Sequence, residues 1–118
     1  MSADSKVLDL TRLEEAFEDD RAGIAEILTM ALETGAKHRR NLELGLSSGD
    51  AAVVARAAHS IKGSAGNVGA ERVAALAAEL DERARAGDLS DARTRIESIH
   101  VAYKDFGDAV EAYRAKLA

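Results

Sequence analysis

An uninterrupted series of apolar residues runs through the last third of the chain. Its members lie three or four positions apart and are Leu89, Ala92, Ile96, Ile99, Tyr103, Phe106, Val110, Tyr113 and Leu117. This spacing follows the α-helical repeat of about 3.6 residues, so it places the apolar side chains on one face of a long helix. Such a helix is stable when that face packs against other helices. The pattern therefore predicts a helical bundle.

Shorter patterns predict four further helices. They are a short helix from about Thr11, a second from about Arg21 to Leu46, a third that follows Asp50 and ends at Asn67 or Val68, and a fourth from about Ala70 to Ala86. The composition agrees, because the chain has no proline and only 3% aromatic residues. Short loops favour antiparallel neighbours. We therefore predict an all-α fold: an antiparallel up-down-up-down four-helix bundle with a short N-terminal lid helix.

Several residues carry signals for helix ends. Thr11 and Glu14 have the spacing of a capping box, and Asp20 and Asp50 are predicted N-caps. Gly69 is predicted to follow the third helix in the left-handed backbone conformation.

The second helix has an unusual inner face. Gly35, His38 and Gly45 lie on it, and these residues are weak core formers. We therefore expect neighbouring apolar residues to share the burial: Ile27, Leu32, Leu44 and Leu46. The same helix carries a basic cluster at positions 37–40, which we interpret as a solvated face.

Length and charge exclude several functions. The 118 residues fit a single domain, 1–118, with no room for an ATP-binding module and no Gly-rich phosphate loop. A formal net charge of −5 argues against a general nucleic-acid binder. The sequence has no cysteine, no signal-peptide pattern and no run of about 18 apolar residues. We expect a cytoplasmic monomer with no membrane partner.

The predicted third helix carries an exposed histidine among small residues. In a helical projection the aliphatic side chains gather on the face opposite His59: Val54, Ala57, Ile61, Ala65 and Val68. His59 therefore faces solvent, with Lys62 three positions later and Gly63 four positions later. The rest of this face consists of Ala52, Ala55, Arg56 and Gly66. An imidazole that another macromolecule must reach needs such clearance, and a nearby lysine offsets the charge of a phosphoryl group.

The segment His59-Ser60-Ile61-Lys62-Gly63-Ser64-Ala65, followed by Gly69-Ala70, resembles the signature of histidine phosphotransfer (HPt) domains. These domains carry a phosphoryl group between aspartates of receiver domains in phosphorelays. The resemblance implies that His59 is phosphorylated, that Lys62 neutralises the phosphoryl charge and that Gly63 lets the receiver approach. Many members carry a phenylalanine in the preceding helix, where this chain has Met30. Core packing is expected to differ there.

The resemblance also implies the partners. They are response-regulator receiver domains, with a hybrid sensor histidine kinase as a further candidate, and the protein is expected to be a phosphoryl carrier without a kinase site of its own. No intrinsic cofactor is expected, because the Mg²⁺ belongs to the receiver. We expect the receiver to dock on the strip formed by Ala52, Ala55, Arg56, Gly63 and Gly66. The second helix is expected to lie alongside this strip.

Two alternatives remain at this point. The chain could be a helical adaptor that binds a receiver or another partner through the patch around His59, which is then never phosphorylated. A di-metal bundle requires Glu-x-x-His on two helices, and only Glu97-Ser98-Ile99-His100 fits, so no metal site is expected. His38 and His100 are expected to be structural.

Overall fold

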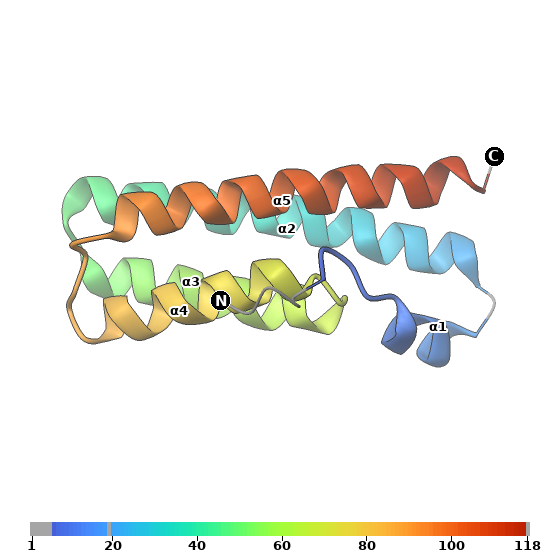
Figure 1. The fold of residues 1–118 in the computed structure, drawn as a ribbon, viewed down its shortest axis with the longest axis horizontal. Coiled ribbons are helices and arrows are strands. Elements are labelled where there is room, and N and C mark those ends of the chain that lie inside the picture. Colours follow the sequence, from blue (N-terminus) through green and yellow to red (C-terminus); the bar gives the residue numbers. More distant parts are fainter. Residues whose placement is uncertain (1–5, 19, 118) are drawn as a thin grey trace.

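The computed structural model describes residues 6–18 and 20–117, and that part of the chain contains five α-helices. They are α1 (Thr11–Phe17), α2 (Arg21–Ser48), α3 (Ala51–Asn67), α4 (Glu71–Arg85) and α5 (Ala92–Ala115). Figure 1 shows α2 beside α5 and α3 beside α4, with α1 next to the first turns of α2. The predicted all-α bundle with a short N-terminal helix is confirmed. No helix in the described ranges is long and apolar enough to cross a membrane.

The core is formed by the predicted apolar faces. Each long helix contributes side chains that are almost fully buried: Ile24, Leu28, Leu42, Val54, Ile61, Val73, Leu80, Ile96, Ile99, Phe106 and Val110. The apolar series of α5 ends before Leu117, which lies beyond the helix and is 40% exposed. α3 and α4 are shorter than α2 and α5, so they leave the first turns of α2 uncovered (Figure 1). α1 packs on α2 there, and its Leu13 is buried.

Most of the predicted helix ends are confirmed. The Asp20 side chain accepts a hydrogen bond from Gly23 N, and Asp50 accepts from the backbone of Ala52 and Val53. Gly69 has a φ of +83°.

The predicted capping box at Thr11 is wrong. The Asp9 carboxylate accepts hydrogen bonds from the Thr11 backbone N–H (3.0 Å) and hydroxyl (2.7 Å), and Leu10 occupies the N-cap position. Asp9 N also donates to Gly69 O at 2.8 Å. A Cβ atom on Gly69 would collide with the Asp9 carbonyl. The segment before α1 is therefore held against the turn that ends α3.

Glycines on the inner face of α2 allow close helix contacts. Gly35 is buried, and a Cβ atom there would overlap the ring of Tyr103 on α5. Gly45 is also buried, and a Cβ atom there would lie 2.9 Å from Val54 on α3. These glycines admit side chains from other helices into the core. Ile27, Leu32 and Leu46 share the burial as expected, because they are half-buried against the core. The same expectation is wrong for Leu44, which is 62% exposed.

The basic cluster of α2 is not simply a solvated face. The Arg39 guanidinium lies 4.6 Å from the centre of the Tyr103 ring, at cation–π distance. Beside it, His100 Nε2 lies 2.9 Å from a Glu43 carboxylate oxygen, and Arg93 donates to the other oxygen at 2.7 Å. These hydrogen bonds, first from Arg93 and then from His100, lower the pKa of Glu43 to about 2. His100 therefore joins α5 to α2, as expected of a structural histidine.

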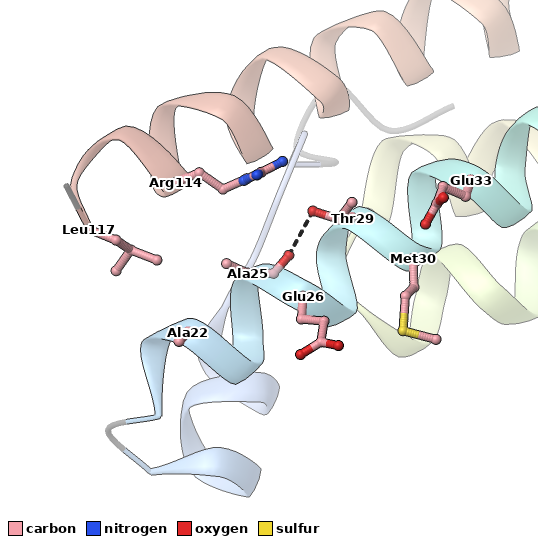
Figure 2. Close-up of a pocket in the computed structure, with 8 residues that line it drawn as sticks. All are labelled: Ala22, Ala25, Glu26, Thr29, Met30, Glu33, Arg114 and Leu117. Atoms are coloured by element: carbon pink, nitrogen blue, oxygen red, sulfur yellow. Dashed lines mark hydrogen bonds between the residues drawn. The ribbon is translucent and has the colours of Figure 1, made fainter.

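A hollow of about 610 Å³ lies between the beginning of α2 and the end of α5 (Figure 2). Met30 lines it and is 57% exposed, so this residue takes no core position. Arg114 and Leu117 approach from the α5 side, and the Thr29 hydroxyl donates to the Ala25 carbonyl. The hollow lies at the end of the bundle where α1 packs.

Candidate functional site

His59 lies in the middle of α3 and faces solvent. Its side chain is 62% exposed, whereas the aliphatic residues on the other face of α3 are buried. The helical period determines this division, since the apolar face of α3 packs into the bundle and the opposite face cannot. The predicted exposure of His59 is confirmed.

The strip beside His59 is open, as predicted from the glycines. A Cβ atom on Gly63 or Gly66 would meet no atom within 4 Å outside the helix itself. Ala52, Arg56, Lys62 and Gly63 are exposed, and Ala55 and Gly66 are half-buried. Another protein can therefore reach this face of α3 without displacing a large side chain.

One shallow hollow is lined by His59, and a second shares Asp81 and Arg85 with it. The first, of about 370 Å³, is lined by His59 together with Ala55, Arg56, Ser60, Asp81 and Arg85. The second, of about 500 Å³, is lined by Lys62, Ala78, Asp81, Glu82, Arg85 and Ala86. All of these residues belong to α3 and α4 or to the residue that ends α4. None of the lining residues comes from α2, the helix expected alongside the strip, and α4 borders both hollows instead.

Two residues of α4 that the sequence analysis did not identify complete the site. Asp81 Oδ2 lies 3.2 Å from His59 Nδ1, and Arg85 Nη2 donates to the same oxygen at 2.7 Å. Asp81 is only 4% exposed. The sequence does contain a signal that Asp81 is buried. Asp81 follows Val73 and Ala77 at intervals of four, so a carboxylate stands on the apolar face of α4.

The charges near His59 suit an anionic group. Arg56, Lys62 and Arg85 are exposed cations that line the two hollows, and Glu82 is an exposed anion on the Lys62 side. An exposed imidazole nitrogen is a nucleophile, and nearby cations reduce the repulsion that a phosphoryl group meets on approach. Across the described ranges, no group of three or more His, Asp or Glu side chains is placed to hold a metal ion. The arrangement can accept and hold a phosphoryl group.

Comparisons with known proteins agree with this chemistry. The family model of the Hpt domain matches residues 26–116, a range that includes α3 and α4 completely. The crystal structure of histidine-containing phosphotransfer protein B (HptB) from Pseudomonas aeruginosa PAO1 is similar, with a TM-score of 0.85 and 30% sequence identity. The match covers 98% of each chain. A comparison with curated proteins gave no match.

Proposed function

The chain belongs to the Hpt domain family, and from this premise we propose that it carries the phosphoryl group of a phosphorelay on His59. A histidine phosphotransfer role follows from the family. The choice of His59 rests on one observation: it is the histidine whose ring is 62% exposed on a face cleared by Gly63 and Gly66. His38 and His100 are half-buried, and His100 is bound to Glu43.

The residues around His59 have distinct roles in this proposal. Lys62 offsets the charge of the phosphoryl group, and Gly63 gives the receiver room to bring its aspartate into line. Ala52, Ala55, Arg56 and Gly66 form the surface on which the receiver docks. The partners are receiver domains and the kinase components of the relay. If the protein were only a helical adaptor, an exposed His59 flanked by cations would have no chemical use. Membership of the Hpt family also favours phosphoryl transfer over the adaptor role.

The protein is proposed to lack a kinase site of its own, and Mg²⁺ is supplied with the receiver. We expect no label when the purified protein is incubated with radiolabelled ATP and Mg²⁺. Addition of a receiver domain phosphorylated on its aspartate should give a label on the protein within seconds to minutes. That label should be lost in acid and kept in base, as the phosphoramidate bond of phosphohistidine requires. Labelling by ATP alone would contradict the carrier proposal.

Lys62 is expected to assist transfer through its charge. Lys62→Ala should slow transfer from a phosphorylated receiver roughly tenfold, since a nearby unit charge at a protein surface is worth about 1–4 kcal/mol. Lys62→Arg keeps the charge with a different reach and should be intermediate. The free energy of unfolding should change by less than about 0.5 kcal/mol, because Lys62 is exposed. Stopped-flow transfer rates measure the effect, and a wild-type rate for Lys62→Ala would remove Lys62 from the site.

A further inference from the structure

The outer face of α2 carries a row of exposed side chains, which we call the outer stripe of α2. Its members are Glu26, Met30, Glu33, Lys37, Arg40 and Leu44. At 100° per residue these positions fall within about 80° of the helix circumference, so they point in one direction. The core residues of α2 lie on the opposite face. Within the described part of the chain, therefore, no other helix covers the stripe.

Two large apolar side chains of the stripe are exposed to solvent. Met30 is 57% exposed and Leu44 is 62% exposed. They are 14 positions apart, which corresponds to about 21 Å along the helix. Met30 also lines the hollow of about 610 Å³ at the end of the bundle, as Figure 2 shows. A single exposed apolar residue is ordinary, but two on one face of one helix, one of them beside a hollow, offer apolar area that association would bury.

The charges of the stripe are separated along the helix. The anions, Glu26 and Glu33, lie in the N-terminal half of α2, and the cations, Lys37 and Arg40, lie in the C-terminal half. Within residues 6–18 and 20–117, none of these four side chains forms a salt bridge. A second α2 lying antiparallel on the stripe would set the anions of one copy against the cations of the other, whereas a parallel one would set like charges together. The stripe is therefore complementary to itself in the antiparallel orientation.

We propose that two copies of the chain associate through the outer stripe, with their α2 helices antiparallel and the two-fold axis near Lys37. Glu33 of each copy then lies opposite Arg40 of the other. Leu44 of each copy packs on Met30 of the other, beside the hollow. The two Lys37 side chains lie near the axis, each about one helical turn from Glu33 of the other copy. The contact is the same on both copies, as in most homodimers, and departs from the monomer expected from the sequence.

This association leaves the surface around His59 open in both copies. Among the described helices, α2 and α4 each pack on α3 and α5 and not on each other, so they lie at opposite corners of the bundle. The hollow lined by His59 is formed by α3 and α4. The outer stripe points away from these two helices, because the core face of α2 points toward the bundle. The association therefore does not depend on the proposed function of His59.

The dimer is expected to be weak and sensitive to salt. One pair of helices with a mostly charged contact surface is a small interface, so we expect a Kd of about 10–100 µM at about 20 mM NaCl. At about 500 mM NaCl the Kd should rise roughly tenfold, because salt screens exposed ion pairs. Sedimentation velocity of the full chain, over a concentration range that brackets this Kd, measures both values. A monomer throughout that range at low salt would overturn the proposal.

Charge reversals test the pairing of Glu33 with Arg40. Glu33→Lys sets two cations against each other, and Arg40→Glu sets two anions against each other. Each should raise the Kd about tenfold, because the pair occurs twice in the dimer. The double variant Glu33→Lys/Arg40→Glu restores opposite charges and should recover most of the wild-type affinity. Single variants that associate like the wild type, or a double variant that does not recover, would contradict the proposed pairing.

Leu44→Ser tests the apolar contact, and Val101→Ser is its matched control. Val101 is a comparably exposed apolar residue, at 61%, but it lies on α5 outside the stripe. Leu44→Ser should raise the Kd tenfold or more, and Val101→Ser should leave it unchanged. Both positions are exposed, so both variants should melt close to the wild type. Association that is kept in Leu44→Ser and lost in Val101→Ser would place the interface on α5 and overturn the proposal.

Disulfide cross-linking tests the orientation, since the chain has no cysteine of its own. Lys37→Cys places two thiols near the axis and should give a covalent dimer under mild oxidation. Met30→Cys alone should give little, because the two positions lie about 21 Å apart in the antiparallel pair. A mixture of Met30→Cys and Leu44→Cys should give the mixed dimer. Efficient cross-linking of Met30→Cys with itself, or no mixed dimer, would overturn the antiparallel arrangement.

Discussion

Replacing His59 with glutamine is expected to abolish phosphoryl transfer and leave the fold intact. The variant lacks the nucleophilic nitrogen, so label from a phosphorylated receiver should fall below detection. His59 is exposed, so the free energy of unfolding should stay within about 0.5 kcal/mol of the wild type. Glutamine is preferred to alanine because its amide can still donate to the buried Asp81 carboxylate, which otherwise keeps only Arg85.

His38→Gln is the matched control for this experiment. It removes another helical histidine of the same protein, half-buried on α2, whose pKa is lowered mainly by burial. Transfer to this variant should equal the wild-type rate. Two results would contradict the assignment of His59: label that persists in His59→Gln, or loss of label in His38→Gln while the protein remains folded. A large loss of stability in His59→Gln would show that the histidine supports the fold.

Gly63→Gln is expected to block transfer without weakening the protein. The side chain would begin in open space one helical turn from His59 and extend across the approach of the receiver. Displacement of the reacting groups by about 1 Å can lower a rate on the order of a hundredfold. Glycine is a poor helix residue, so the variant should be as stable as the wild type or up to about 1 kcal/mol more stable. Melting curves and transfer rates test both parts.

Two alanine variants separate docking from stability. Gly63→Ala adds only a methyl group to the same open position and should keep most of the transfer rate. Gly107→Ala lies on α5, where a Cβ atom would make an ordinary contact of 3.7 Å with Leu32, so it should raise stability without affecting transfer. If Gly63→Gln instead unfolds, or transfers phosphate at the wild-type rate, the open strip is not the docking surface.

The local structure around His59 could be predicted because it depends on neighbours in sequence. The helical period alone places His59 opposite Ile61 and Ala65, and these two residues are buried. The caps at Asp20 and Asp50 involve backbone groups two or three residues away, and the left-handed Gly69 follows from its own lack of a Cβ atom. Such features need no knowledge of which helices pack together. The same reasoning failed at Thr11, where Asp9 is the competing acceptor.

The sequence by itself determined the helices and the exposed histidine with its lysine and glycine, and only the tertiary structure decided what lies against them. The contact of His59 with Asp81 joins residues 22 positions apart on different helices. The contacts of the Tyr103 ring with Gly35 and with Arg39 likewise depend on how α2 and α5 are aligned. A helical period fixes which residues share a face, but the alignment of two faces depends on packing along the whole bundle. For this reason the buried carboxylate beside His59 emerged only once α4 was placed beside α3.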